Sequence, residues 1–326
     1  MRVLITGVGG FAGSHLADYC LTRPGVDVFG TVRRLERLGN AAPLQGRCTF
    51  VASDMRDMAT VVAAVQSCRP DVVFHLAAQA SVAASFEDPA GTLMDNAVGQ
   101  LNVIRAVLEH APAARVLVAG SAYEYGLVRP EENPIDESVP LRPMDPYAVS
   151  KVTQDLFGYQ YALSHRLQAV RVRAFNHTGP RQSTEFVASR FARLIAEIEA
   201  GQREPVLTVG NLTAIRDFTD VRDVVRAYFL AATKGQPGEV YNVGSGTPRT
   251  IQEILDTLVA TCRVRVTVQE DPALLRPLDV PTLICNAAKL HQHTGWTPEL
   301  PLDRTLSDLL DYWRDERNRT TRIPRI

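Results

Sequence analysis

Short apolar runs alternate with longer amphipathic stretches through the first half of the chain. The runs contain few polar positions, which is typical of strands buried on both faces of a parallel sheet. The predicted strands are Arg2–Ile5, Val26–Gly30, Cys48–Ala52, Val72–Leu76, Val116–Ala119 and Ala169–Arg173. Between them, apolar residues at helical spacing predict helices over Ala12–Leu21, Met58–Ser67, Asp95–Glu109 and Tyr147–His165. Strands that alternate with helices predict βαβ units and a doubly wound α/β sheet.

The second half of the chain has a less regular pattern. Its predicted elements are the strand Val206–Val209 and the helices Phe186–Glu199, Val221–Ala232, Ile251–Thr261 and Leu302–Trp313. We therefore expect a doubly wound α/β domain over residues 1–175, with a return segment near 218–245. A smaller C-terminal α/β substrate domain is expected over 176–217 and 246–326. The basic tail from Arg314 onward is expected to be frayed and solvated.

Composition narrows the class of protein. The chain has 326 residues, of which 45% are hydrophobic and 22% charged, as in globular proteins of more than one core. The formal net charge of −1 does not suggest a nucleic-acid partner. Five scattered cysteines without a CxxC pair indicate buried thiols in a reducing compartment. Without a signal-peptide pattern or an apolar run of roughly 18 residues, we expect a cytoplasmic protein with no membrane partner.

Three glycines follow the first predicted strand. Gly7, Gly10 and Gly13 have a G-x-x-G-x-x-G spacing between that strand and the first predicted helix. Glycine at these positions permits a tight turn, lets the backbone approach a pyrophosphate, and lets the helix pack closely on the strand. The free N–H groups and the positive dipole at the helix start then hold the anion. The loop predicts a dinucleotide site, and the alternative is an ordinary glycine-rich turn.

The end of the second predicted strand distinguishes NADP from NAD. An NAD site usually carries Asp or Glu there, which binds the ribose 2′-hydroxyl. This chain has no acid at that point and has Arg33 and Arg34 instead. Guanidinium groups suit a 2′-phosphate, which they can bind with two hydrogen bonds. We expect NADP(H), with NAD(H) as the alternative if both arginines are solvated surface residues.

Tyr147 and Lys151 lie four residues apart on a predicted helix, so their side chains share one face. Asp145 and Pro146 supply a plausible N-cap and first helical residue. The helix dipole and the nearby ammonium favour tyrosinate, so the pKa of Tyr147 is expected to fall below its free value of about 10. Such a tyrosine can exchange a proton with a substrate oxygen while a nicotinamide carries the hydride. Ser121 can donate a hydrogen bond to the same oxygen.

A Y-x-x-x-K spacing alone is common on solvated helix faces. Here the glycine loop and Ser121 precede it in the expected order, which argues against coincidence. No spacing of His and Cys predicts a metal site, because His291, His293 and Cys285 lack a partner pair.

With these motifs the chain resembles the extended short-chain dehydrogenase/reductase family. The resemblance covers residue 1 to about residue 310 and rests on Thr6–Gly13, Ser53–Asp57, His75–Ala78, Ser121, and Tyr147 with Lys151. It implies a Rossmann fold and catalytic roles for Ser121, Tyr147 and Lys151. It also implies that Lys151 holds the nicotinamide ribose. The cofactor residues expected from the loop and the resemblance are Gly7, Gly10, Phe11, Gly13, Arg33, Arg34, Asp54, Met55, Leu76, Ala77, Ala78, Tyr147 and Lys151.

Three segments of the second half are similar to the GDP-sugar branch of this family, namely Asn176–Arg181, Val209–Phe218 and Arg276–Val280. The resemblance implies that Arg216 and Arg276 hold the nucleotide diphosphate. It implies that Asp279, where the branch usually has Glu, contacts guanine or ribose. The alternative is that these arginines cap surface loops. The implied substrate residues are Ser121, Tyr123, Asn176, Arg181, Asn211, Arg216, Arg276 and Asp279.

One position separates the two activities of this branch, dehydration and reduction. A 4,6-dehydratase removes the C5 proton and eliminates the C6 hydroxyl, so it needs a second acid/base pair beside the tyrosine. Dehydratases of the branch have Thr-x-Glu, with the threonine at the position of Ser121. Here the third residue is Tyr123, and Glu124 is expected to point the other way. We therefore expect NADPH-dependent reduction of the C4 ketone of GDP-4-keto-6-deoxy-D-mannose to GDP-D-rhamnose, with Tyr147 protonating the oxygen.

Three alternatives stay open: a GDP-mannose 4,6-dehydratase, another nucleotide-sugar epimerase or reductase, and a non-enzymatic NADP-sensing protein of the same fold. The motifs also leave the stereochemistry at C4 open, since hydride delivery to the opposite face would give GDP-6-deoxy-talose. The helices predicted at Asp95–Glu109 and Tyr147–His165 carry apolar residues beyond one core-facing stripe. Related enzymes pair these helices in a four-helix bundle, so we expect a homodimer.

Overall fold

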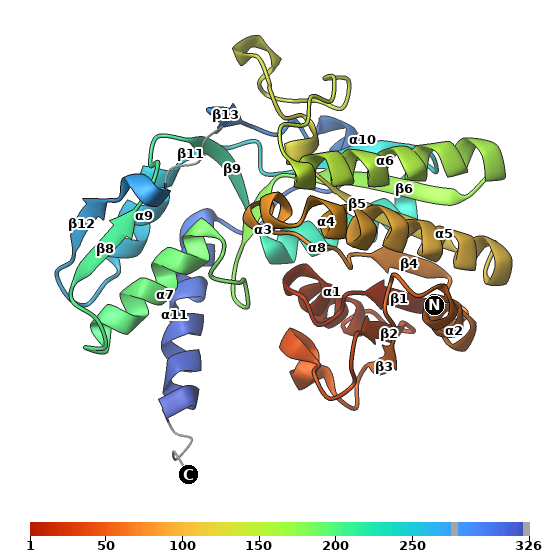
Figure 1. Cartoon of the computed structure of the whole chain (residues 1–326), viewed down its shortest axis with the longest axis horizontal. Helices are drawn as coiled ribbons and strands as arrows, with labels where there is room; N and C mark the ends of the chain where they lie inside the picture. The colour runs from red at the N-terminus through yellow and green to blue at the C-terminus, as the bar shows by residue number, and fades with distance from the viewer. Residues whose placement is uncertain (275–279, 322–326) are drawn as a thin grey trace.

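A seven-stranded parallel sheet forms the centre of the molecule (Figure 1). The computed structural model describes residues 1–274 and 280–321, with side chains described up to residue 316. The strands of the sheet are β1 (Arg2–Thr6), β2 (Asp27–Val32), β3 (Thr49–Ala52), β4 (Val72–His75), β5 (Arg115–Ser121), β6 (Gln168–Ala174) and β10 (Val240–Val243). Their order is β10-β6-β5-β4-β1-β2-β3, which reverses between β1 and β4. Doubly wound sheets bind ligands at such a reversal, outside the carboxyl ends of the strands.

Helices cover both faces of this sheet. One face packs against α1 (Phe11–Leu21), α8 (Val221–Lys234) and α10 (Ala288–Thr294), and the other against α2 (Met58–Cys68), α5 (Gly99–His110) and α6 (Pro146–His165). Successive residues of a strand pack on opposite faces of the sheet. In β1, Val3 and Ile5 pack in the core with α1 and α8, while Leu4 packs in the core with α2 and α5. In the part of the chain that the structure describes, no helix has both the length and the apolar run that a bilayer crossing requires.

The helix predicted from Asp95 has an irregular start. Two short helices, α3 (Val82–Glu87) and α4 (Pro89–Leu93), lead into a π-helical turn over Met94–Val98, and α5 follows directly. The wider π-helical turn changes the direction of successive side chains, so Asp95 and Asn96 bind different partners, as described below.

The second part of the chain has its own hydrophobic core, to the left of the sheet in Figure 1. Helices α7 (Val187–Glu199), α9 (Ile251–Ala260) and α11 (Leu302–Thr321) pack there. Strand β9 (Ile215–Asp220) pairs with β7 (Asn176–Thr178), β11 (Pro248–Thr250) and β13 (Thr282–Leu283). Strand β8 (Val206–Val209) pairs with β12 (Thr267–Glu270).

The predicted α/β fold with a doubly wound parallel sheet is confirmed, and each predicted strand of the first half is observed within two residues of its expected bounds. The sequence did not reveal the short strands β7, β9, β10, β11, β12 and β13 or the short helices α3, α4 and α10. Segments of this length carry too few residues to show a period of 2.0 or 3.6.

The prediction of a frayed tail from Arg314 onward is wrong for residues 314–321, and residues 322–326 lie outside the described residues. Helix α11 continues to Thr321, and Arg314 docks on α7. Its Nε and Nη2 atoms donate to Glu199 Oε2 and Oε1 at 2.8 and 2.7 Å. The Glu199 side chain is 6% exposed and also accepts the Arg263 N–H at 2.8 Å. A paired guanidinium therefore fixes a segment whose composition alone indicated solvation.

Replacing Arg314 with Ala should lower the free energy of unfolding by about 1–3 kcal/mol, because Glu199 would lose its bidentate partner in a buried position. Urea denaturation followed by circular dichroism measures this change. The matched control is Arg304→Ala, whose exposed ion pair with Asp308 on the same helix should contribute less than about 0.5 kcal/mol. Equal effects of the two substitutions would contradict a docked Arg314.

Candidate functional site

The glycine loop connects β1 to α1 at the carboxyl edge of the sheet. Gly7 has a φ of +70°, and a Cβ there would lie 2.8 Å from the Cα of Ala77. A Cβ on Gly13 would overlap the Gly7 carbonyl oxygen. Gly10 is the N-cap of α1 and provides no side-chain cap, so the first N–H groups of the helix face outward from bare backbone. The loop has the geometry of an anion-binding turn.

A threonine ties this loop to the loop after β4. Thr6 Oγ1 accepts the N–H groups of Leu76 and Ala77, each at 3.1 Å, and hydrogen bonds with His75 Nδ1 at 2.9 Å. The predicted cofactor residues Gly7, Leu76 and Ala77 are therefore brought together by one buried hydroxyl.

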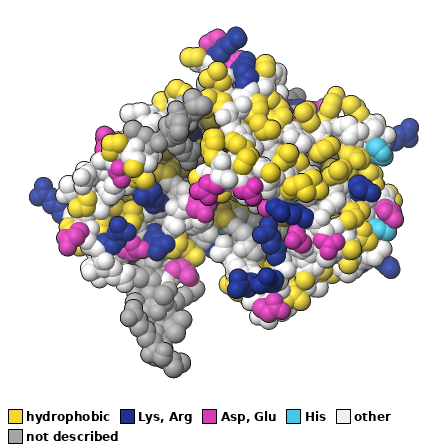
Figure 2. All heavy atoms as spheres, in the orientation of Figure 1, with side chains coloured by type: hydrophobic (Ala, Val, Ile, Leu, Met, Phe, Trp, Pro, Cys, Tyr) yellow, Lys and Arg dark blue, Asp and Glu magenta, His cyan; other side chains and the backbone are white. Residues whose placement is uncertain are grey.

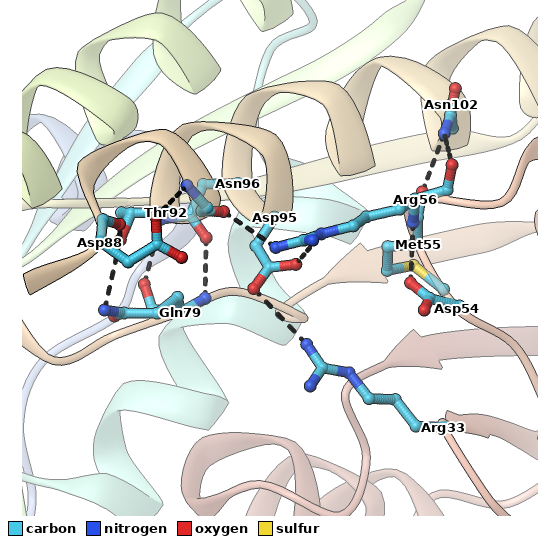
Figure 3. A network of polar contacts seen from close by, with 11 residues as sticks. Arg33, Asp54, Met55, Arg56, Gln79, Asp88, Thr92, Asp95, Asn96 and Asn102 are labelled. Carbon is cyan, nitrogen blue, oxygen red and sulfur yellow. Dashed lines mark hydrogen bonds and ion pairs between the residues drawn. The ribbon is translucent and has the colours of Figure 1, made fainter. Parts of the chain in front are cut away.

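Arg33 at the end of β2 belongs to a charged network that the sequence did not reveal (Figure 3). Its Nη2 atom lies 3.6 Å from Asp95 Oδ2, and its side chain is 76% exposed. Arg56 holds the same carboxylate more tightly, with Nε 2.5 Å from Asp95 Oδ1 and Nη2 3.1 Å from the Gly91 carbonyl. Asp54 Oδ1 accepts the Arg56 N–H at 2.9 Å. Two guanidinium groups from neighbouring strand ends thus meet at one carboxylate.

The next residue of the π-helical turn, Asn96, binds in the opposite direction. Its amide pairs with the Gln79 backbone, accepting from N at 2.7 Å and donating to O at 3.0 Å. It also donates to Ser150 Oγ at 2.8 Å, on the α6 turn between Tyr147 and Lys151. The loop after β4 and the helix α6 are therefore fixed to each other through one buried amide.

The three residues predicted to be catalytic do come together. Ser121 ends β5, and its side chain lies close enough to Tyr147 to lower the pKa of the Tyr147 hydroxyl. Tyr147 and Lys151 are buried on one face of α6, whose predicted cap is confirmed, since Asp145 Oδ1 accepts the Ala148 N–H at 2.7 Å. Lys151 Nζ donates to the Ala119 carbonyl at 2.9 Å and to Gln154 Oε1 at 2.8 Å.

The expected fall in the pKa of Tyr147 is wrong for this structure. Burial raises the pKa of Tyr147 above its ordinary value, and the nearby Ser121 side chain opposes this rise only in part. Burial also lowers the pKa of Lys151 to about 8, against the opposing effect of Glu124. Desolvation disfavours both charged forms, and the predicted fall in the pKa of Tyr147 took only the helix dipole and the Lys151 ammonium into account.

Tyr123 and Glu124 diverge, as the sequence predicted. The Tyr123 ring lies edge-on to Tyr147, with 6.2 Å between ring centroids. Glu124 points into the interior, where Oε1 accepts the Ser121 N–H at 2.7 Å and Oε2 lies 3.2 Å from Arg173 Nε. An aromatic ring, and not a carboxylate, therefore lies beside Tyr147 at the third position of this motif.

The predicted substrate residues are distributed over several elements. Asn176 on β7 and Arg216 on β9 lie on paired strands, and Arg216 Nη1 donates to the carbonyls of Ile215 and Pro281. Asn211 precedes β9, where its Oδ1 accepts the Thr213 N–H at 2.9 Å. Arg181 is bound to Asp18 of α1 at 2.7 Å. Arg276 and Asp279 lie outside the described residues.

Sequence reasoning missed Arg56, Asp95 and the inward role of Glu124. The signal for Glu124 was present, because Ser121-x-x-Glu124 has the spacing of a capping box, and both of its hydrogen bonds are formed. No local pattern links Arg56 with Asp95, which are 39 residues apart. Among the described residues, no group of three or more His, Cys, Asp or Glu side chains is arranged to hold a metal ion.

Comparisons with known proteins agree with this architecture. Residues 4–309 match the family model described as GDP-mannose 4,6 dehydratase. The chain is 32% identical to GDP-6-deoxy-D-mannose reductase of Pseudomonas aeruginosa, over 96% of this chain and 97% of that protein. It is 29% identical to a GDP-mannose 4,6-dehydratase of Vibrio cholerae, over 95% and 92%. The solved structure of RMD from Pseudomonas aeruginosa complexed with NADPH superposes with a TM-score of 0.84 at 30% identity, covering 97% of this chain and 100% of that one.

Proposed function

The chain belongs to the GDP-mannose 4,6-dehydratase family, and we propose that within it this protein reduces the C4 ketone of GDP-4-keto-6-deoxy-D-mannose to GDP-D-rhamnose with NADPH. The observation that carries the proposal is Tyr123, which lies edge-on to Tyr147 where a dehydratase needs an acid. The 32% identity with a GDP-6-deoxy-D-mannose reductase supports the same activity.

The residues around the glycine loop fit a dinucleotide. Gly7 and Gly13 leave no room for a Cβ, and the uncapped start of α1 offers N–H groups to a pyrophosphate. Asp54 and Met55 would hold the adenine side, and Arg33 and Arg34 the 2′-phosphate. When bound, NADPH supplies the hydride for the reduction. The complex of one related structure with NADPH supports NADP(H), and another related structure, in complex with NAD, keeps NAD(H) as the alternative.

Three buried residues, Ser121 at the end of β5 and Tyr147 and Lys151 in α6, would carry out the proton transfer. Ser121 would orient the C4 oxygen, and the Tyr147 hydroxyl would donate its proton as the alkoxide develops. A protonated tyrosine suits this direction of reaction, and the raised pKa of Tyr147 keeps it protonated. Lys151 would hold the nicotinamide ribose and support the tyrosine as an ammonium. Because the pKa of Lys151 lies at about 8, activity should decline as the pH rises through that value.

We assign the nucleotide-sugar to the second part of the chain, residues 176–217 and 246–326 without α10, which packs against the central sheet. There Arg216, Arg276 and Asn211 would bind the nucleotide diphosphate, with Asp279 toward the base or ribose. Asn176 and Arg181 follow β6 and would lie between cofactor and sugar. A dehydratase is the second candidate, because the matching family model carries that description and dehydratases are among the relatives.

A homodimer is part of the proposal. Helix α6 exposes an apolar stripe of Val149, Leu156, Tyr159 and Leu163, spaced so that they lie on one face. Phe86, Leu93 and Met94 add exposed apolar area from the neighbouring segment, and hydrophobic side chains gather on this face (Figure 2). Contiguous apolar patches of this kind mark protein interfaces, and a self-complementary patch gives a two-fold dimer.

Purified protein should oxidise NADPH when it is given GDP-4-keto-6-deoxy-D-mannose and not when it is given GDP-mannose. Tyr147→Phe should lower kcat by about 100-fold or more, because the proton donor is lost, while Tyr161→Phe on the same helix should leave it unchanged. NADPH absorbance measures the rate. Dehydration of GDP-mannose without net NADPH consumption would favour the dehydratase.

Arg33→Ala should weaken NADP⁺ binding by about tenfold and leave NAD⁺ binding within about twofold, since one charge-assisted contact with the 2′-phosphate is lost. Isothermal titration calorimetry with both dinucleotides measures the ratio. Arg47→Ala, at another exposed arginine after the second strand, is the matched control and should change neither affinity. An equal loss for both dinucleotides would contradict the assignment of Arg33.

Leu156→Asp should convert the protein from two chains to one, because it places a charge in the centre of the α6 stripe. Light scattering after size exclusion should give a mass near 35.8 kDa for this variant and twice that for the unmodified protein. Val268→Asp, at an exposed apolar residue of β12, is the control and should remain dimeric. A monomeric unmodified protein would overturn the dimer.

A further inference from the structure

Glu124 is a fully buried carboxylate that the proposed reaction does not use. It lies on the short turn that directly follows β5, and its Oε1 accepts the Ser121 N–H at 2.7 Å. Its Oε2 lies 3.2 Å from Arg173 Nε. Burying an ionisable group is costly unless it is paired and hydrogen bonded, so this arrangement needs a reason.

Glu124 and Lys151 are anchored on the same short piece of backbone. Lys151 Nζ donates to the Ala119 carbonyl at 2.9 Å, and Glu124 accepts the N–H of Ser121, two residues further along. Gly120 lies between these anchors, and a Cβ there would overlap Glu124 Oε1. The carboxylate and the ammonium therefore flank the last peptide units of β5, which end at Ser121.

The charges behind this backbone are balanced without Lys151. Asp155 of α6 binds Arg173 Nη2 at 2.5 Å and Arg171 Nη1 at 3.0 Å. Two arginines therefore face two carboxylates, those of Asp155 and Glu124. If Glu124 carried no charge, two arginines would face the single carboxylate of Asp155, and the buried ammonium of Lys151 would lose the charged neighbour that raises its pKa.

We propose that Glu124 is a positioning residue for the proton transfer, which holds Ser121 against Tyr147 through the Ser121 N–H and supplies the negative charge that supports the Lys151 ammonium. The inference rests on the proposed function for its kinetic test, and on the proposed contact of Lys151 with the nicotinamide ribose for its binding test. Burial lowers the pKa of Lys151, and Glu124 opposes this effect. Burial and the nearby Asp155 carboxylate raise the pKa of Glu124 to about 8, and Arg173, the Ser121 N–H and the Lys151 ammonium oppose that rise only in part, so the carboxylate is ionised in the pH range where Lys151 loses its proton.

The sign of the pH effect follows from these charges. Reduction requires protonated Lys151, so kcat/KM falls as the pH rises through the pKa of Lys151. Removing the negative charge of Glu124 lowers that pKa further, so the decline should begin at lower pH. The other titratable or charged groups around Glu124, Lys151 and Tyr147 are His75, Tyr123, Tyr125, Asp145, Asp155, Arg171, Arg173 and Tyr228.

Glu124→Gln keeps an oxygen for the Ser121 N–H and removes the charge. The alkaline limb of kcat/KM should move to lower pH by about one unit in this variant. The control is Glu137→Gln, since Glu137 is another partly buried carboxylate that accepts a backbone N–H, that of Asn242 at 2.7 Å. Glu137→Gln should leave the limb in place. An unmoved limb in Glu124→Gln would overturn the proposed charge effect.

A binding measurement separates this inference from the proposed function. The affinity for NADP⁺, followed by protein fluorescence across the same pH range, should weaken at a midpoint that moves with the Lys151 pKa, and so moves down in Glu124→Gln. If the unmodified protein does not reduce the keto sugar but the midpoint moves, the proposed function fails and the role of Glu124 stands. A midpoint that is the same in both proteins contradicts the role of Glu124.

Glu124→Asp separates the effect of the negative charge from the effect of its position at the Ser121 N–H. This variant also provides the test if Glu124→Gln does not fold. The shorter side chain keeps the negative charge but withdraws it from the Ser121 N–H. We expect kcat to fall by about tenfold with the alkaline limb near its original pH. An unchanged kcat would contradict the positioning of Ser121, and a limb shifted down by a full unit would contradict the charge effect.

Discussion

The burial of charged side chains against the end of β5 is the constraint on which the rest of the site depends. Lys151, Glu124 and Arg173 are each at least nine-tenths buried, and each is held by named partners. A buried charge without partners would cost several kcal/mol, so these groups fix one another's positions. Strand β6 carries arginines where the sheet faces α6 because Asp155 of that helix receives both of them. The rigidity of the proton-transfer group follows from this mutual dependence.

The cofactor half of the site is built from hydrogen bonds between loops. Thr6 joins the loop after β1 to the loop after β4, and Asn96 joins the latter to α6. The residue before Asn96 is Asp95. It forms ion pairs with Arg33, which follows β2, and with Arg56, which lies in the loop after β3. Because both residues lie in the π-helical turn, their adjacent side chains point toward these two different sets of partners. A single irregular turn therefore links the site predicted for the 2′-phosphate to the helix that carries Tyr147 and Lys151.

Features that depend only on residues close together in the sequence could be predicted from the sequence. The glycine loop, the cap at Asp145, and the common face of Tyr147 and Lys151 follow from residues close in sequence, and all are observed. The pKa of Tyr147 was predicted in the wrong direction, because burial depends on chain segments far from it. The docking of Arg314 on Glu199 and the meeting of Arg56 with Asp95 likewise join distant residues. Arg276 and Asp279 lie outside the described residues, so the resemblance alone supports their roles.

The joins between the central sheet and the second part of the chain are short. Strand β6 runs into β7 through Phe175 alone, and its N–H is bound to the Val243 carbonyl at 2.8 Å. Strand β9 ends at Asp220, which is already the N-cap of α8. The chain therefore passes between the two sheets with almost no linker at these points. The two parts cannot be separated there without breaking a strand or a helix cap. Exchange of the sugar-side segments between homologues would have to preserve strand register at these two crossings, and the chain crosses again between β10 and β11 and on either side of α10.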